Sequence, residues 1–127
     1  MIIDSGTVIT RLPPTAYSAL RTAFRAGMTQ YPLTKAWSIL DTCYDFSKFT
    51  TVYIPKINLV WGGNANVDIH PQGILLANGA SQVCLAFAAN ENDYDYAGIF
   101  GNNQQKTLEV VYDLNEGNVG FASRGCE

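Results

Sequence analysis

The sequence is short of the residues that build metal and nucleic-acid sites. His70 is the only histidine in 127 residues, and no two of the three cysteines form a Cys-x-x-Cys pair, which excludes the common zinc arrangements. Charged residues make up 15% of the chain and leave a formal net charge of −3, so no basic surface for a phosphate backbone is expected. No apolar run approaches the roughly 20 residues of a membrane span. The sequence predicts no metal, cofactor, nucleic acid or membrane among its partners.

The sequence also lacks the basic leader and apolar segment of a signal peptide. Residues typical of a buried strand follow Met1 at once, so we interpret this absence as the loss of an upstream part. Hydrophobic residues make up 47% of the chain, which is typical of a globular protein. A length of 127 residues predicts a single domain with a core of its own.

The cysteines are odd in number: Cys43, Cys84 and Cys126. An odd count indicates one disulfide and one further thiol whose partner lies elsewhere. Three buried free thiols in a cytosolic protein are the alternative. A disulfide between Cys43 and Cys84 would contribute about 4 kcal/mol by restricting the unfolded chain.

Only one segment has the period of a helix. Between residues 15 and 28 apolar side chains recur on one face, after Pro13-Pro14 and with Gly27 near the end. Nearly everything else is typical of short strands. We expect these strands at residues 2–3, 43–46, 53–61, 67–69, 73–76, 83–88, 97–100, 108–112 and 119–121.

Turn residues separate the expected strands. Asn78-Gly79 predicts a type I′ hairpin, and residues 113–118, which contain Glu116-Gly117, predict a second hairpin. Many short strands with frequent turns favour a mostly β barrel or sandwich with one or two short helices.

One carboxylate stands in a distinctive position, in the segment Asp4-Ser5-Gly6-Thr7. It follows the apolar pair Ile2-Ile3 directly, and Gly6 permits a tight turn. The pattern places one acidic group at the edge of the hydrophobic core, with a hydroxyl on either side of the glycine. The segment occurs only once in the chain.

Two later segments accompany this motif. Ala97-Gly98-Ile99-Phe100-Gly101-Asn102 is an apolar strand ending in glycine, and Asn118-Val119-Gly120-Phe121-Ala122 is a final strand. Together with Asp4-Ser5-Gly6-Thr7 they resemble the C-terminal lobe of the pepsin-like aspartic proteases. Residues 9–13, 40–46 and 104–108 are similar to the plant branch of that family, the nepenthesin-like and chloroplast nucleoid DNA-binding-type proteases. The resemblance covers essentially the whole chain, and it implies a single β-barrel-like lobe over residues 1–127, without its N-terminal lobe.

The resemblance implies a role for each residue of the first motif. Asp4 matches the second catalytic aspartate of the family. Ser5 matches a hydroxyl that reaches across to the other lobe. Gly6 brings a backbone N–H to the carboxylate, and Thr7 matches a hydroxyl that hydrogen-bonds it.

The resemblance extends to the later segments and to the cysteines. Ile99-Phe100-Gly101 matches the strand that packs behind the catalytic loop, where relatives commonly carry Ile at the Phe100 position. Cys43 and Cys84 match the disulfide within this lobe. Cys126 resembles a cysteine that bonds to the N-terminal lobe, which accounts for the odd count.

The activity implied by the resemblance is that of an aspartic endopeptidase, which needs two carboxylates. One of them takes a proton from water and the other polarises the peptide carbonyl. Because the chain offers one such carboxylate and lacks the family's flap, we expect it to be inactive alone. The expected partners are a peptide or protein substrate and either a missing N-terminal lobe or a second copy of the chain, as in retroviral proteases.

Two further points stay open at this level. Some plant relatives, such as xylanase inhibitors, have lost catalysis, so a non-catalytic binding or inhibitor module is an alternative function. Ile9 and Thr10 either line the substrate cleft or pack as part of a strand.

The disulfide that the resemblance implies favours the secretory pathway or the extracellular space, with chloroplast or vacuole as alternatives.

Overall fold

A computed structural model describes residues 1–61, 65–79, 81–91, 98–123 and 125, and these form three helices and twelve strands. The helices are α1 (Pro14–Ala26), α2 (Pro71–Ile74) and α3 (Asn102–Gln105). The strands are β1 (Ile2–Ile3), β2 (Thr10–Leu12), β3 (Leu33–Thr34), β4 (Cys43–Asp45), β5 (Asn58–Trp61), β6 (Ala65–Asp68), β7 (Leu75–Asn78), β8 (Gln82–Leu85), β9 (Phe87–Ala89), β10 (Ile99–Phe100), β11 (Glu109–Asp113) and β12 (Asn118–Ala122).

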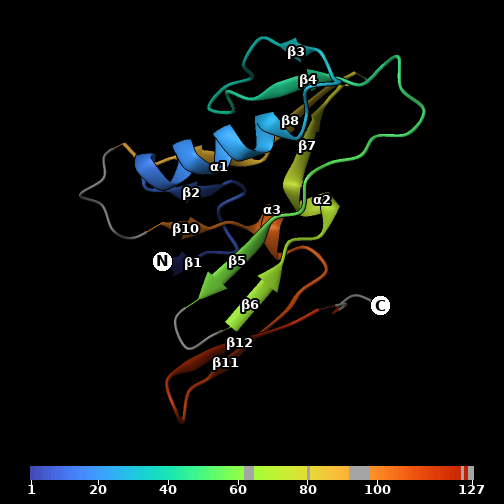
Figure 1. Ribbon diagram of the computed structural model, residues 1–127. Coiled ribbons are helices and arrows are strands. Elements are labelled where there is room, and N and C mark those ends of the chain that lie inside the picture. The colour runs from blue at the N-terminus through green and yellow to red at the C-terminus, as the bar shows by residue number, and fades with distance from the viewer. Residues whose placement is uncertain (62–64, 80, 92–97, 124, 126–127) are drawn as a thin grey trace.

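The described strands form two four-stranded sheets and two hairpins (Figure 1). The first sheet has the order β1-β10-β2-β9, in which β1 runs parallel to β10 and β2 parallel to β9. The second has the order β3-β4-β8-β7 with antiparallel neighbours throughout. The hairpins are β5-β6 and β11-β12, and the second of these extends from the lower end of the molecule in Figure 1.

The mostly β character of the lobe is confirmed, but several details differ from the sequence-based expectation. Of the strand expected at 53–61 only residues 58–61 form a strand, the strand expected at 83–88 is divided between β8 and β9, and β2 and β3 were not expected. Within the described ranges no sheet closes into a barrel, and three helices are present where one or two were expected. α2 and α3 are four residues each, too short for a helical period to show in the sequence. The strand expected at 73–76 is therefore split between the end of α2 and the start of β7.

Helix α1 confirms the apolar period of its sequence. Tyr17, Phe24 and the following Met28 are buried, while Leu20 packs at the edge of the same cluster. The helix begins with proline in its first turn, where the missing N–H costs no hydrogen bond. It ends two residues earlier than expected, at Ala26, where the N–H of Gly27 closes the last turn on Ala23 O and Phe24 O.

Both predicted hairpins are present. β7 and β8 are joined around Asn78-Gly79, where Gly79 has a φ of +72°, a backbone conformation that favours glycine. Asn78 pairs with Gln82, and because Ala80 lies outside the described residues the turn type is not assigned. β11 and β12 pair from Glu109–Ala122 to Asp113–Asn118, so the turn falls on the predicted residues.

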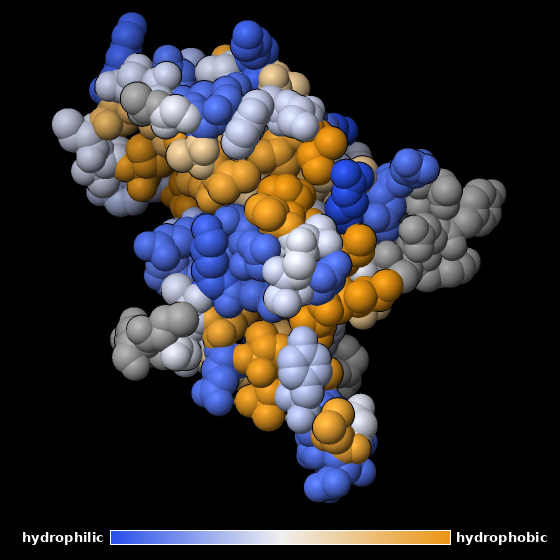
Figure 2. Space-filling view, turned by 180° about the vertical axis from the view of Figure 1, so that it is seen from behind, coloured by the Kyte–Doolittle hydropathy of each residue, from blue (hydrophilic) through white to orange (hydrophobic). Residues whose placement is uncertain are grey.

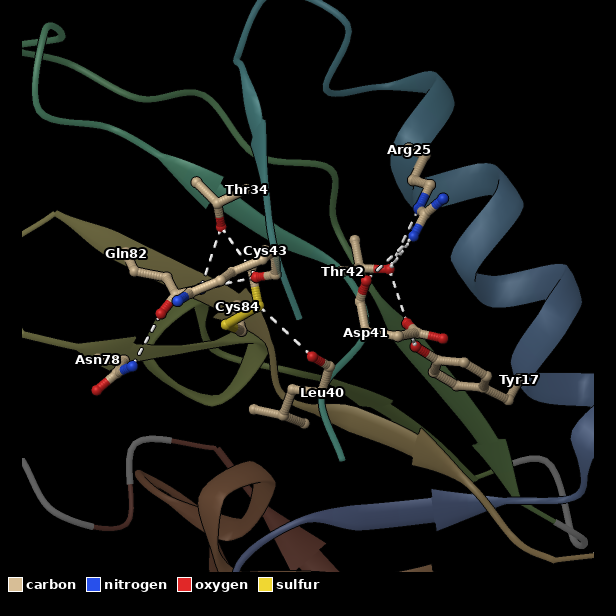
Figure 3. The surroundings of a disulfide bond; sticks show 11 residues. Tyr17, Arg25, Thr34, Leu40, Asp41, Thr42, Cys43, Asn78, Gln82 and Cys84 are labelled. Atoms are coloured by element: carbon tan, nitrogen blue, oxygen red, sulfur yellow. Dashed lines mark hydrogen bonds between the residues drawn. A yellow bond between two sulfur atoms is a disulfide. The ribbon is translucent and has the colours of Figure 1, made fainter. Parts of the chain in front are cut away.

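The disulfide joins Cys43 of β4 to Cys84 of β8, two residues that face each other directly across the sheet. Both cysteines are completely buried, next to Leu40. Figure 3 shows that the residues just before this bond, Asp41 and Thr42, point toward helix α1. The pairing is the one that the family resemblance implies, and it fastens the second sheet at its centre. Cys126 lies outside the described residues.

Candidate active site

Asp4 follows the last residue of strand β1, and strand β10 fixes its position. Ile2 and Ile3 pair in parallel with Ile99 and Phe100, and the Asp4 N–H donates to the Phe100 carbonyl at 3.1 Å. Behind this pair the core is closed, because Phe100 is completely buried. The carboxylate therefore stands at the edge of the core, as the sequence pattern predicts.

Two donors from its own turn hold the Asp4 carboxylate. The Thr7 hydroxyl donates to Oδ2 at 2.6 Å, and the Gly6 N–H donates to Oδ1 at 2.9 Å. The Thr7 N–H closes the turn by donating to the Asp4 carbonyl at 3.3 Å. The bonds from Thr7 and Gly6 favour the ionised form and lower the pKa of Asp4 below the ordinary value for aspartate. Among the described residues no cation pairs with this carboxylate.

Ser5 is exposed beside Asp4. Its carbonyl accepts a hydrogen bond from the Asn102 side-chain amide at 3.0 Å. Its hydroxyl has no partner within the part of the chain that the structure describes, so it is available to a group outside the lobe. The role that the resemblance gives to Ser5 stays a prediction.

Gly101 lets the loop after Asp4 lie directly on the end of β10. A Cβ atom there would come within 2.7–2.8 Å of backbone atoms of Thr7, Val8 and Ile9, closer than carbon atoms can approach. The Gly101 N–H also donates to the Thr10 hydroxyl at 2.9 Å. The glycine after Ile99-Phe100 is therefore required by the close passage of the backbone at residues 7–9.

The Phe100 side chain fits behind the loop because it packs against other aromatic rings. Its ring makes edge-on contacts with Trp61 and Phe121, with ring centroids 5.4 and 5.8 Å apart. Trp61 and Phe121 also lie against each other, with centroids 5.1 Å apart. The three rings form a local cluster that accommodates the larger side chain at this position.

A buried amide network, which the sequence reasoning missed, lies beneath the loop. The Gln104 side chain is completely buried, and its oxygen accepts from both the N–H and the hydroxyl of Thr10. Its nitrogen donates to the Gly73 carbonyl at 2.8 Å and to the Ala86 carbonyl at 2.7 Å. All four hydrogen-bonding positions of the amide are thus used, which joins β2, α2 and the β8–β9 segment. In the sequence, residues 104–108 indicate only the family resemblance.

Thr10 is the first residue of strand β2 and is completely buried in the network, so for this residue strand packing is the interpretation found. Ile9 precedes the strand, is half-buried and packs against the cluster of Leu40 and the disulfide. Val8, directly after Thr7, is 48% exposed.

The other described aspartates are engaged elsewhere. Asp41 accepts hydrogen bonds from Tyr17, Arg21 and Thr42, and it forms an ion pair with Arg21 at 2.6 Å. Asp68 accepts from Asn58, while Asp45 and Asp113 accept from backbone N–H groups of their own turns. Asp45 resembles Asp4, because it also ends a strand and accepts an N–H from two residues on, but Lys48 contributes to the lowered pKa of Asp45 and no described cation does so for Asp4.

A cavity of about 850 Å³ does not contain Asp4. It lies between the segment 52–57, helix α2 and Leu108, and no residue of the segment 4–7 lines it. The Asp4 carboxylate therefore stands outside this cavity. In the described part of the chain, no three His, Cys, Asp or Glu side chains gather to hold a metal ion, and no helix is long and apolar enough to cross a membrane.

The fold and this loop define one lobe of the pepsin-like type, with its aspartate at the end of a strand. Residues 1–123 match the family described as xylanase inhibitor C-terminal, and the chain belongs to that family. Solved structures with the same fold include edgp (TM-score 0.83, 19% identity, 95% of this chain and 31% of that one) and the lupine-seed 7S globulin conglutin gamma (TM-score 0.80, 22% identity, 95% and 31%).

The curated relatives are plant aspartic proteases, which confirms the resemblance inferred from the sequence. An aspartyl protease family protein of Arabidopsis thaliana is 58% identical over 98% of this chain and 26% of its own length. Aspartyl protease AED1 of Arabidopsis thaliana is 50% identical over 98% of the chain and 26% of its length. Aspartic proteinase nepenthesin-2 of Nepenthes gracilis is 35% identical over 99% and 28%. The chain spans about a quarter of the length of these relatives.

Proposed function

We propose that this chain is the lobe that supplies one of the two catalytic aspartates of an aspartic endopeptidase, and that Asp4 is this residue. The observation that carries the proposal is the geometry of the loop. A carboxylate at the end of a core strand receives the Gly6 N–H and the Thr7 hydroxyl, and among the described residues no cation neutralises it. A group held in this way can exchange a proton with a water molecule beside it.

The reaction needs a second carboxylate opposite Asp4. Two carboxyl groups about 3 Å apart cannot both ionise, so they share one proton. The ionised member takes a proton from the attacking water while the protonated member donates to the carbonyl of the substrate peptide. The two resulting pKa values belong to the pair, and Asp4 alone titrates as a single aspartate.

The second carboxylate comes, in this proposal, from an N-terminal lobe. Ser5 is exposed beside Asp4, and among the described strands the hairpin β11–β12 pairs with no other. Four large hydrophobic residues of that hairpin are exposed: Val111 (46%), Tyr112 (57%), Leu114 (91%) and Val119 (41%). In Figure 2 apolar residues cover much of the rear face and continue to its lower end. A two-stranded ribbon with apolar groups on its surface is marginal alone and gains stability from a neighbour.

A chimera tests the proposal. The 125 matched residues of Aspartyl protease AED1 would be replaced by the corresponding residues of this chain, and acid proteolysis measured on a denatured protein substrate. We expect cleavage by the chimera and its loss in the Asp4→Asn variant. An active Asp4→Asn chimera would show that Asp4 is not catalytic.

The second copy of the chain is the other source of a carboxylate. Sedimentation of the 127-residue chain over a range of concentrations distinguishes the two. The two-lobe proposal expects no dimer that cleaves substrate. A concentration-dependent dimer with pepstatin-sensitive activity would show that the second carboxylate comes from another copy of the chain and not from an N-terminal lobe.

A non-catalytic inhibitor module is the second candidate, favoured by the description of the family as xylanase inhibitor C-terminal. The test is inhibition of an endoxylanase by the chain and by the chimera. Inhibition that persists in the Asp4→Asn variant, together with no proteolysis, would support this candidate. The intact hydrogen bonds of the Asp4 loop support the protease.

The Cys43–Cys84 disulfide supports an oxidising compartment, and we infer the secretory pathway or the extracellular space. Cys126 keeps its predicted role as a bond to the other lobe. Peptide mapping of a two-lobed form without reduction tests this role, and a free Cys126 thiol would contradict it.

A further inference from the structure

Asn102 is bonded to the catalytic loop on both sides of Gly6. Its side-chain amide donates to the Ser5 carbonyl at 3.0 Å, and its backbone N–H donates to the Thr7 carbonyl at 2.6 Å. These two carbonyls belong to the residues that flank the glycine. One residue, 97 positions away in the sequence from Ser5, therefore sets the spacing of the turn that contains the carboxylate donors.

Asn102 is itself held firmly in place. The preceding Gly101 lies against the backbone of Thr7, Val8 and Ile9, and its N–H is bonded to the buried Thr10 hydroxyl. The N–H of the following Asn103 donates to the Val8 carbonyl at 3.0 Å. Three successive residues are thus in contact with the loop, and the amide of Asn102 acts from a fixed base.

We propose that Asn102 is a positioning residue for Asp4, which keeps the Gly6 N–H and the Thr7 hydroxyl on the carboxylate by holding the Ser5 and Thr7 carbonyls. An effect of Asn102 on catalysis rests on the proposed function, whereas its effect on the geometry of the Asp4 loop does not. An uncharged amide suits this place because it donates at every pH and adds no charge beside Asp4. A carboxylate could not donate to Ser5 when ionised, and it would repel the charge of Asp4.

Titration of Asp4 in the 127-residue chain tests the effect on the loop. The carboxyl carbon of Asp4 would be followed by NMR over pH in the wild type, Asn102→Ala and Asn102→Asp. We expect the pKa of Asp4 to rise in Asn102→Ala, because the donors of Gly6 and Thr7 are less well aligned with the carboxylate. It should rise further in Asn102→Asp, because a second negative charge disfavours ionisation.

Asn78→Asp is the matched control. Asn78 also donates through its side chain, to Gln82 at 2.8 Å, but it lies in the second sheet, away from strand β1. This variant should leave the titration of Asp4 unchanged. If Asn102→Ala does not fold, Asn102→Asp keeps the size of the side chain and the backbone bond to Thr7. An Asp4 titration equal to that of the wild type in the folded Asn102 variants overturns the proposal.

Activity of the AED1 chimera supplies the second readout. Asn102→Ala should lower kcat about 10- to 100-fold with little change in KM, because the reacting group is displaced while substrate contacts remain. If Asn102→Ala has a normal kcat while Asp4→Asn is inactive, the positioning role of Asn102 in catalysis is overturned and the proposed function stands. Activity retained in Asp4→Asn overturns the proposed function, and the titration then still decides the effect of Asn102 on the loop.

Discussion

Asp4 and Asp41 are two aspartates with lowered pKa values and opposite surroundings. Asp4 receives its hydrogen bonds from Thr7 and Gly6, both within three residues, and no described cation pairs with it. Burial alone would raise the pKa of Asp41, but bonds from Tyr17, Thr42 and Arg21 outweigh it. Asp4 therefore remains accessible to water and to a second carboxyl group, whereas Asp41 connects helix α1 to the second sheet.

The surroundings of Asp41 show what a structural carboxylate looks like. Tyr17 and Arg21 bond it from helix α1. Figure 3 shows Thr42 between Asp41 and Arg25 of the same helix, and the two bonds from Arg25 to Thr42 measure 3.1 and 3.2 Å. The Arg21 guanidinium also lies 5.5 Å from the centre of the Tyr17 ring. Burial and the neighbouring Asp41 raise the pKa of Tyr17, so this phenol stays a donor. The following residue, Cys43, carries the disulfide.

The largest expected effect is the loss of activity in Asp4→Asn, which should distinguish Asp4 from Asp41. In the chimera, Asp4→Asn should reduce kcat/KM by about 10² to 10⁴-fold, because the proton transfer at this position is lost. Its melting temperature should hardly change. The matched variant Asp41→Asn should show the reverse, with activity retained and a lower melting temperature. Equal effects of the two variants on activity would remove the distinction.

Gly101→Ala should damage the Asp4 side of the molecule without touching the Asp41 side. The added methyl group meets backbone atoms 2.7–2.8 Å away, which cannot move independently. We expect a loss of about 1–3 kcal/mol in the free energy of unfolding, typical of overpacking. Urea denaturation measures it. The NMR signals of the Tyr17 ring should stay in place, and a shift there would show that the two regions are coupled.

Tyr17→Phe should loosen Asp41 and leave Asp4 unaffected. The Tyr17 side chain is almost fully buried, and its hydroxyl donates to a charged acceptor. We expect a loss of about 1–2 kcal/mol in unfolding free energy, since the hydrogen bond is to an ionised group that is partly exposed. The same denaturation experiment measures it, and wild-type stability in Tyr17→Phe would contradict the contact.

The pH dependence of stability should identify Asp41 as one of its sources. Because the pKa of Asp41 is lowered on folding, its contribution is present above the ordinary value of 3.8 and is lost as the pH falls through the lower folded value. The difference in melting temperature between the wild type and Asp41→Asn should therefore shrink below about pH 4. A difference that is constant between pH 7 and pH 3 would exclude this source.

Arg21→Ala should give the smallest effect. The ion pair with Asp41 is well formed, but the two side chains are 34% and 40% exposed. Solvent screens such pairs, so we expect about 0.5 kcal/mol or less. Lys at this position is the matched control, because it keeps the charge and loses the planar guanidinium. A loss above about 2 kcal/mol would place Arg21 among the main supports of helix α1.

The sequence was most informative where partners are close in the chain. Asp4, Gly6 and Thr7 form one turn, so the motif itself predicts both bonds to the carboxylate. The buried face of helix α1 follows from its period in the same way. Asn102 and Gln104 act on residues 97 and 94 positions away, and no local pattern reports such contacts. The polar partner of Tyr17 was equally hidden, because a period indicates which face is buried but not where a hydroxyl finds its acceptor.

The buried amide of Gln104 has a consequence for how sequences of this lobe can diverge. Its four bonds reach Thr10, Gly73 and Ala86, which belong to three separate segments. An apolar side chain at this position would leave the Thr10 donors and the Ala86 carbonyl without these partners, at about 1–3 kcal/mol for each unpaired group. The Gly73 carbonyl would keep its bond from the Asn103 amide. Drift at position 104 therefore requires a simultaneous change at position 10, and the two residues should be inherited as a pair.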